Sequence, residues 1–411
     1  MQTNLADFIK NTREGEEADA ILRRCVHCGF CTATCPTYQL LGDELDGPRG
    51  RIYLIKQVLE GAQPTENTQL HLDRCLTCRN CESTCPSGVQ YGRLLDIGRK
   101  VVEQKVPRSL LQQARRKALK TLLPRKWLFT PLFKTGQAVR GILPEALRHK
   151  LPQSAPAGAW PARSHARKML VLDGCVQPAM APNINAATAR VLDTLGVQLL
   201  VAPKAGCCGA LRFHLNDQEA GLDDMRRNID AWWPYVEQGA EAIVMTASGC
   251  GVTVKEYGHL LAHDAAYAAK AERISALCRD LCEVLEPFAG ALQKKIVPRQ
   301  HKVAYHPPCT LQHGQQLRGK VETVLRAAGV EVSLCADSHL CCGSAGTYSV
   351  LQPELSTKLR NNKLAHLLAT GAETIVSANI GCLTHLQSGT ETPVRHWIEP
   401  IDDALKECRL G

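Results

Sequence analysis

Several features that would place this chain in a common class are missing from its sequence. No stretch approaches about 18 uncharged apolar residues, so we expect no helix that crosses a bilayer. The segment from Met1 to Arg13 lacks the apolar core of a signal peptide, which predicts a reducing compartment where structural disulfides are rare. No GxGxxG motif follows a predicted strand, so we expect no dinucleotide site.

Cysteine, by contrast, is abundant, and eight of the 20 cysteines form two copies of one spacing. The copies are Cys25, Cys28, Cys31 and Cys35-Pro36, and then Cys75, Cys78, Cys81 and Cys85-Pro86. In such runs three thiolates bind one [4Fe–4S] cluster, and the cysteine beside proline binds the neighbouring cluster. The spacing therefore predicts two [4Fe–4S] clusters, the first bound by Cys25, Cys28, Cys31 and Cys85, the second by Cys75, Cys78, Cys81 and Cys35.

Disulfides and zinc are the alternatives for these runs. Disulfides do not suit a reducing compartment. Zinc sites usually take two CxxC pairs, whereas here a triplet plus a Cys-Pro cysteine occurs twice. Two neighbouring iron–sulfur clusters form a path for single electrons, so electron transfer is the function that this region predicts.

Beyond residue 168 the sequence repeats itself, and cysteines set the register. In the first unit Cys175 is followed by Cys207-Cys208-Gly209. In the second unit Cys309 is followed, at the same spacing, by Cys341-Cys342-Gly343, so the two units are offset by 134 residues. Cys250 and Cys382 close the two units at an offset of 132 residues. Each unit alternates short apolar segments with helical ones, which predicts two duplicated α/β domains, each with a parallel sheet covered by helices.

The expected elements place the cysteines at one edge of each sheet. The predicted strands are Met169–Asp173, Val197–Ala202 and Ala242–Ala247, and then Lys302–His306, Val330–Leu334 and Thr374–Ala378. The predicted helices are Asn185–Leu195, Asp217–Tyr235, Val321–Ala328 and Pro353–Leu368. Open α/β sheets bind ligands at the carboxyl ends of their strands. Four thiols should therefore converge in each unit: Cys175, Cys207, Cys208 and Cys250 in the first, and Cys309, Cys341, Cys342 and Cys382 in the second.

The residues leave open what these two sites hold. An iron–sulfur cluster, a tetrahedral zinc ion, a redox-active dithiol and plainly buried cysteines all remain. His306, near Cys309, is a weaker candidate for direct chemistry, because the first unit has no histidine at the matching position. Cys278 and Cys282 lie four residues apart in an apolar helical pattern, so we expect them to pack in the core.

Residues 105–168 carry 15 Lys or Arg against one acid, Glu145, and are punctuated by proline. We consider three interpretations of this segment: a solvated linker, a contact with an anionic membrane surface or a partner subunit, and a nucleic-acid-binding segment. No recognition motif supports nucleic-acid binding. The predicted multidomain α + α/β chain has an α-helical ferredoxin-like domain (1–104), this basic connector (105–168), a first cysteine-rich domain (169–295) and a second (296–411).

The doubled CxxCxxCxxxCP run, the Asp-Gly-Pro-Arg-Gly-Arg-Ile segment from Asp46 to Ile52 and the duplicated CCG domain resemble the iron–sulfur subunit of glycolate oxidase (glycolate dehydrogenase). The resemblance covers essentially the whole chain. It implies an oxidoreductase complex in which FAD-containing partner subunits oxidise glycolate to glyoxylate and this subunit carries electrons toward a membrane quinone. It also implies a cytoplasmic protein, peripheral on the inner face of the cytoplasmic membrane, without nucleic acid as a partner.

The wider superfamily leaves alternatives. Lactate-utilisation proteins, the anaerobic glycerol-3-phosphate dehydrogenase iron–sulfur subunit and heterodisulfide reductase subunits are similar in layout, so another 2-hydroxy acid or glycerol 3-phosphate is an alternative substrate of the complex. A disulfide or quinone reductase at a CCG site and a zinc-bound docking scaffold also remain. Heterodisulfide reductase-type CCG domains end in CxxC, but Ala247 and Asn379 stand three residues before Cys250 and Cys382, so their five-cysteine cluster is not carried over.

Overall fold

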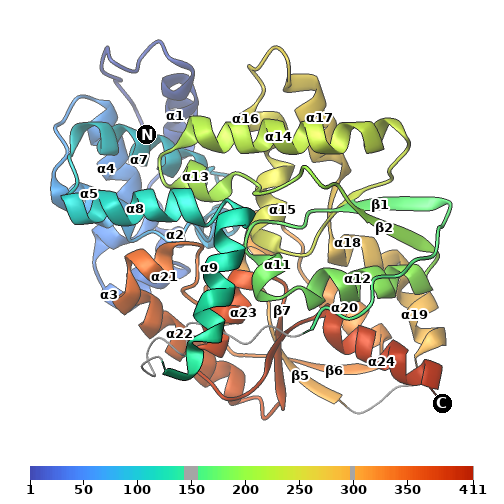
Figure 1. Ribbon diagram of the computed structural model, residues 1–411. Coiled ribbons are helices and arrows are strands. Elements are labelled where there is room, and N and C mark those ends of the chain that lie inside the picture. The colour runs from blue at the N-terminus through green and yellow to red at the C-terminus, as the bar shows by residue number, and fades with distance from the viewer. Residues whose placement is uncertain (143–155, 297–300, 411) are drawn as a thin grey trace.

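The computed structural model describes residues 1–142, 156–296 and 301–410. A group of N-terminal helices lies beside two α/β units, each with its own four-stranded parallel sheet (Figure 1). The predicted fold class, a helical domain followed by two α/β domains, is confirmed. Part of the predicted connector, residues 143–155, and residues 297–300 near the start of the second cysteine-rich domain lie outside the described residues.

The N-terminal region consists of short helices around one apolar core. Ile52, Ile55 and Leu59 of α4 are buried there against α7, whose Gly98 lies against the Ile55 side chain. The segment between the two cysteine runs therefore packs as a helix in this core. The first helix begins at Arg13, where the side chain of Thr12 caps it by accepting from Gly15 N. The helices are α1 (Arg13–Arg24), α2 (Phe30–Ala33), α3 (Pro36–Leu41), α4 (Pro48–Leu59), α5 (Glu66–Asp73), α6 (Asn80–Thr84) and α7 (Tyr91–Lys105).

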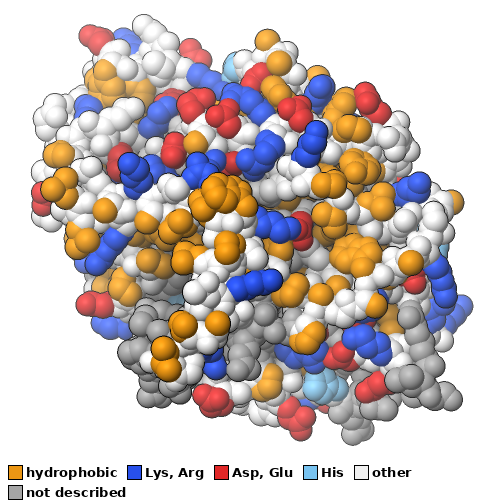
Figure 2. Space-filling model, viewed as in Figure 1, with side chains coloured by type: hydrophobic (Ala, Val, Ile, Leu, Met, Phe, Trp, Pro, Cys, Tyr) orange, Lys and Arg blue, Asp and Glu red, His pale blue; other side chains and the backbone are white. Residues whose placement is uncertain are grey.

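Two helices, α8 (Leu110–Leu122) and α9 (Lys126–Ala138), occupy the described part of the basic segment. Ser109 caps α8 and Pro124 follows it, while Pro131 lies within α9. α8 runs along the N-terminal helices, and α9 continues from it to contact α11 (Gln177–Met180) of the first α/β unit (Figure 1). Figure 2 shows apolar side chains gathered on this face, with Lys and Arg among them. The segment thus connects the two halves of the molecule by packed helices.

The first α/β unit has the strand order β2-β1-β3-β4, with all neighbours parallel. Its strands are β1 (Arg167–Val171), β2 (Val197–Val201), β3 (Ile243–Met245) and β4 (Cys278–Asp280). Its further helices are α12 (Asn183–Thr194), α13 (Ala210–His214), α14 (Gln218–Glu237), α15 (Ser248–Lys255), α16 (Tyr257–Leu260), α17 (Ala268–Leu277), α18 (Leu281–Leu285) and α19 (Ala289–Lys295).

The second unit repeats this plan with the order β6-β5-β7-β8, again all parallel. Its strands are β5 (His301–His306), β6 (Val330–Leu334), β7 (Thr374–Ser377) and β8 (Val394–His396). Its helices are α20 (Lys320–Ala327), α21 (Tyr348–Leu351), α22 (Pro353–Leu368), α23 (Ile380–Gln387) and α24 (Ile398–Leu410), and the π-helical turn η4 spans Thr310–Gly314. In both units the first strand lies beside the third, and the chain builds the sheet outward in opposite directions from this pair. Such sheets bind ligands at the carboxyl ends of these two strands.

The fourth strand of each sheet is not expected from the sequence. β4 (Cys-Arg-Asp) and β8 (Val-Arg-His) have three residues each and contain charged residues, whereas the equally short β3 lies within an apolar run. Cys278 lies in β4 and Cys282 in α18, so the single helix predicted for this pair is wrong; Asp280, between them, caps α18 by accepting from Cys282 N. Both thiols are buried, as core packing requires.

The two α/β units share a continuous apolar core that includes Val171 of the first and Val376 of the second. Backbone atoms also join them, because Ser248 N donates to Ala378 O at 3.0 Å. His396 Nε2 lies 2.9 Å from Thr246 O, and α12 packs against α24. The cysteine-bearing edges of both sheets are therefore held in a fixed relation to each other.

Candidate iron–sulfur and CCG-domain sites

The two N-terminal cysteine loops have the same backbone conformation. His27 and Thr77, each two residues after the first cysteine of its run, have φ values of 56° and 53°. Gly29 and Arg79, each four residues after that cysteine, have φ values of 86° and 58°. Residues with positive φ turn successive backbone N–H groups toward one concave side of the loop. Thr77 N donates to Cys75 Sγ at 3.4 Å. The repeated spacing therefore folds into two copies of one sulfur-binding loop.

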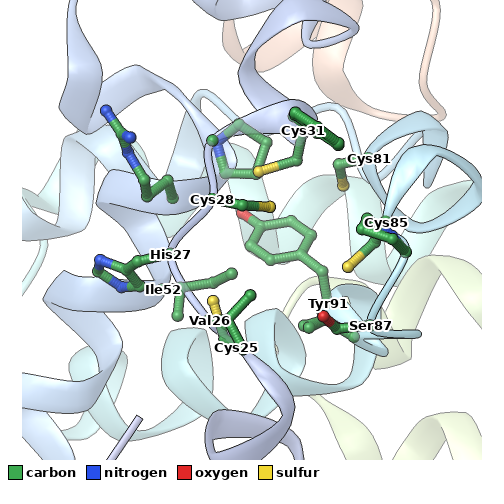
Figure 3. Close-up of a pocket in the computed structure, with 16 residues that line it drawn as sticks. Cys25, Val26, His27, Cys28, Cys31, Ile52, Cys81, Cys85, Ser87 and Tyr91 are labelled. Carbon is green, nitrogen blue, oxygen red and sulfur yellow. The ribbon is translucent and has the colours of Figure 1, made fainter.

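The first of these loops opens onto a cavity shared with the end of the second run. Figure 3 shows the sulfur atoms of the labelled cysteines directed toward a common space beside the Tyr91 ring. Ile52 and Val89 contribute apolar walls. The cysteines that line this cavity are Cys25, Cys28, Cys31, Cys81 and Cys85.

A second cavity lies beside the other loop, again with a cysteine from each run. It is bordered by Cys35 together with Cys75, Cys78 and Cys81, and by Arg51. The Cys-Pro cysteine of each run is thus placed with the triplet of the other run. Cys81 borders both cavities, and the assignment of ligands to each cluster stays a prediction.

The chemistry of these thiols fits a metal cluster. Burial raises the pKa of Cys31 to about 11, and nearby thiols add to the effect. Burial also raises the pKa values of Cys78 and Cys81 well above the ordinary value. Such thiols stay protonated unless a metal supplies the positive charge that stabilises the thiolate. Sulfur-only donor sets of this kind suit iron–sulfur clusters.

A buried ion pair supports the second cavity. Arg51, 1% exposed, donates to His71 O, Thr37 Oγ1 and Asp46 Oδ1 at 2.7, 3.1 and 3.4 Å. The Thr37 hydroxyl also lies 3.3 Å from Cys35 Sγ. Arg51 and Asp46 belong to the segment noted in the sequence between the two runs, but a motif does not reveal which groups its residues contact.

The cysteines of the first α/β unit meet at the carboxyl edge of its sheet. Cys175 follows β1, the adjacent pair Cys207-Cys208 follows β2, and Cys250 lies in the first turn of α15 after β3. The neighbouring Cys207 and Cys250 thiols, together with burial, raise the pKa values of Cys175 and Cys208 well above the ordinary value. The four predicted donors of this unit are therefore brought together.

The second unit assembles its cysteines in the same way. Cys309 Sγ lies 3.8 Å from Cys341 Sγ, and the sulfur atoms of Cys342 and Cys382 lie within 4.8 Å of each other. Gly343, with a φ of 89°, allows the chain after this pair to approach α22; an added Cβ would lie 2.6 Å from Ser356 O. Gly209 stands in the same relation to α14 in the first unit.

The second of these sites adjoins the N-terminal clusters' pockets. Cys78 of the N-terminal region belongs to one buried cluster of side chains with Cys309 and Cys341, together with Leu76 and Tyr348. Nearby, Asn80 Nδ2 donates to His339 O at 3.2 Å. No sequence signal joins Cys78 to Cys309, because only domain packing brings them together.

Comparisons with known proteins first define the class of the molecule. Residues 21–89 match the 4Fe-4S dicluster domain, and residues 169–255 and 303–387 match the cysteine-rich CCG domain. The chain is therefore an iron–sulfur protein with a dicluster domain and a duplicated CCG domain. The dicluster match confirms the predicted pair of [4Fe–4S] clusters.

Full-length relatives then define the family. The chain is 57% identical to the glycolate oxidase iron-sulfur subunit of Escherichia coli (strain K12), over 99% of this chain and 100% of that protein. It is 30% identical to the probable glycolate oxidase iron-sulfur subunit of Bacillus subtilis (strain 168), over 94% of this chain and 91% of that protein. The chain belongs to the family of glycolate oxidase iron–sulfur subunits, as its sequence predicts. Lactate utilization protein A of Bacillus licheniformis is 26% identical over 52% of this chain and 87% of that protein.

Proposed function

We propose that this chain is the electron-transfer subunit of a glycolate dehydrogenase complex. Its FAD-containing partner subunits oxidise glycolate to glyoxylate, and this chain passes the electrons on toward a membrane quinone. Two full-length relatives named as glycolate oxidase iron–sulfur subunits support this role, and the relative named for lactate utilization matches only about half of the chain. The N-terminal clusters supply one-electron carriers.

The ligand assignment that we propose is the crossed one. Cys25, Cys28, Cys31 and Cys85 hold the first cluster, while Cys75, Cys78, Cys81 and Cys35 hold the second. The placement of each Cys-Pro cysteine with the other run's triplet supports it. The corresponding domains are 1–104 for the clusters, 105–168 for the basic connector, and 169–295 and 296–411 for the two cysteine-rich domains.

The observation that carries the electron route is the contact of Cys78 with Cys309 and Cys341 in one buried cluster. If Cys78 holds the second cluster, that cluster is next to the second CCG site, with no solvent-exposed gap for the electron to cross. We therefore place the second CCG site after the N-terminal clusters on the route toward the acceptor.

The complex purified anaerobically with its flavoprotein partners tests this function. Cys28→Ala removes a first-cluster ligand, so glycolate-dependent reduction of a quinone analogue should fall by at least tenfold. Reduction of a dye that accepts electrons directly from the flavin should persist. Cys408→Ala, at an exposed position of α24, is the matched control and should keep both activities. Unchanged quinone reduction in Cys28→Ala, or wild-type protein without iron, would contradict the proposal.

The α8–α9 segment is our proposed attachment site on the inner face of the cytoplasmic membrane. Leu110, Trp127 and Leu132, and Ile142 just beyond α9, are 83%, 72%, 57% and 85% exposed, and Lys134 of α9 is also exposed. Apolar side chains beside basic ones suit an anionic bilayer surface (Figure 2). Across residues 1–142, 156–296 and 301–410, the helices are too short or too polar to span a bilayer.

Flotation with vesicles tests this attachment. Wild-type protein should float with vesicles that contain anionic phospholipid and stay unbound with neutral ones. The double substitution Trp127→Ser and Leu132→Ser should weaken flotation at least tenfold, whereas Leu368→Ser, an exposed leucine at the end of α22, should not. Loss of binding to the flavoprotein partners, with flotation unchanged, would assign the surface to a partner subunit instead.

A further inference from the structure

A buried histidine lies among the cysteines of the second CCG domain. His306 ends β5 and is 1% exposed. Neither of its ring nitrogens has a hydrogen-bond partner among the residues that the structure describes. One of them, Cys342 Sγ and Cys382 Sγ all lie within 4.8 Å of one another. Burying a polar group without a hydrogen-bond partner costs free energy. An imidazole whose two ring nitrogens both lack a partner is therefore a candidate to bind a ligand.

The duplicated first domain differs at this position. The offset that aligns Cys309 with Cys175 aligns His306 with Leu172, which packs in an apolar cluster with Met225 and Trp232. The cysteines are duplicated, but the nitrogen donor is present in the second domain alone. The two sites therefore have different donor sets, four sulfurs in the first and four sulfurs plus one nitrogen in the second.

The geometry suits coordination by the imidazole. Ligand atoms around one zinc or iron ion lie about 2.0–2.3 Å from it and hence about 3–4 Å from each other. A spread of 4.8 Å reaches that range through small side-chain rotations. Neutral imidazole and thiolate occur together as ligands of zinc and, in some [2Fe–2S] centres, of iron.

We propose that His306 is a nitrogen ligand of a metal centre in the second CCG domain, with Cys342 and Cys382 as thiolate ligands of the same metal. The centre contains either zinc or the iron of an iron–sulfur cluster, and Cys309 and Cys341 lie on its side that faces Cys78. The inference rests on the proposed function for the redox role of this centre, but its ligand set is independent of the N-terminal clusters.

Three variants of the full-length chain, purified anaerobically, separate coordination from packing. His306→Leu installs the residue of the first domain, and His306→Cys keeps a metal ligand while removing the nitrogen. His366→Leu alters a partly exposed histidine of the same domain and is the matched control. Circular dichroism and melting curves identify any variant that fails to fold.

Metal analysis and spectroscopy then measure whether the site holds a metal and whether a nitrogen atom coordinates it. Wild-type protein should contain zinc, or iron and acid-labile sulfide beyond the two N-terminal clusters. A nitrogen ligand should appear in zinc-edge X-ray absorption if the metal is zinc, or as ¹⁴N coupling in pulsed EPR if it is iron. His306→Leu should lose most of that metal and keep the N-terminal clusters' EPR signals. His306→Cys should keep the metal and lose the nitrogen signal, and His366→Leu should match wild type.

Some results would overturn the proposal. A folded His306→Leu protein with wild-type metal content and spectra would do so. So would a nitrogen signal that persists in His306→Cys, even if His306→Leu does not fold. Wild-type protein with two N-terminal clusters and no further metal would also overturn it while leaving the proposed function intact. Wild-type protein without the N-terminal clusters would instead contradict the proposed function.

Discussion

At the residue scale, one buried cation connects the segment between the cysteine runs to the second cluster pocket. Arg51 pairs with Asp46, which also accepts from Arg74 Nη1 at 2.8 Å. The same guanidinium contacts Thr37, whose hydroxyl lies beside Cys35 Sγ. A fixed positive charge near cluster thiolates favours the more negative, reduced state and so raises the reduction potential. We therefore expect Arg51 to contribute both to stability and to the reduction potential of the neighbouring cluster.

Replacement of Arg51 by methionine should affect both. The loss of its hydrogen bonds to His71 O and Thr37, and of its charge beside Asp46, should lower the free energy of unfolding by about 3 kcal/mol. The potential of one N-terminal cluster should fall while the other changes less. Chemical denaturation and an EPR-monitored redox titration measure the two effects.

Arg49 offers the control, because its pair with Glu44 is more than one third exposed on both sides. Arg49→Met should cost about 1 kcal/mol or less. If Arg51→Met is as stable as Arg49→Met and both clusters keep their potentials, the structural role given to Arg51 is wrong.

At the residue scale, the grouping of the cysteines could be predicted from the sequence, but their neighbours could not. Local spacing controls how thiols group, so counting residues predicted which cysteines lie near each other, while the ligand set of each site stays a prediction. The neighbours of those thiols depend on contacts between distant segments. The partners of Arg51 and the contact between Cys78 and Cys309 therefore had no sequence signal.

At the scale of elements, long regular segments were predictable and short or composite ones were not. β6 (Val330–Leu334) has the predicted bounds because its apolar residues alternate with polar ones. α22 (Pro353–Leu368) also has them, because a proline opens it and a leucine ends it. β4 and β8 are short and contain charged residues, so no apolar run identifies them. α8 and α9 were not predicted, because proline and an excess of basic residues obscured their pattern. Two of these basic residues, Arg108 and Arg116, pair with Asp73.

Asp73 should hold α8 against the cluster domain. Burial opposes its ionisation, but hydrogen bonds and charge from Arg108 and Arg116 outweigh this and lower its pKa. Asp73→Asn removes the charge and leaves the largely buried guanidinium of Arg116 without its anion, while Arg108 keeps only its pair with Glu103. The expected cost is about 3 kcal/mol. Faster hydrogen exchange across Leu110–Leu122 should identify α8 as the element released.

Asp223→Asn is a matched control, since that carboxylate is 70% exposed in its pair with Arg226. It should leave exchange in α8 and overall stability nearly unchanged. Equal exchange rates of α8 in Asp73→Asn and wild type would show that the helix is held by its other contacts instead.

At the scale of the whole molecule, the three regions pack as one unit. The two α/β units share an apolar core, and the cluster domain contacts both of them: Arg79 pairs with Glu256 of the first, and Ser83 hydrogen-bonds with His313 of the second. Fixed packing keeps redox sites at constant separations. The stability of the interface between the α/β units is therefore also a condition for electron transfer.

His396 makes that interface sensitive to acid. It is fully buried, and burial lowers its pKa to about 3, although its hydrogen bond to Thr246 O opposes the shift. The unfolded chain, with an ordinary histidine pKa of about 6.5, therefore binds protons more tightly than the folded protein. The stabilisation is complete above pH 6.5 and is lost progressively as the pH falls toward 3. At pH 5 the loss amounts to about 2 kcal/mol.

His396→Gln should remove this pH dependence, because glutamine retains an amide donor for Thr246 O and does not titrate. Its free energy of unfolding should be lower than that of wild type at pH 7, and the difference should shrink by about 2 kcal/mol at pH 5. Denaturation followed by tryptophan fluorescence at both pH values gives this difference, and acid effects on the clusters cancel because both proteins carry the same cysteines. A difference that stays constant between pH 7 and pH 5 would mean that His396 is not the group whose protonation separates the two α/β units.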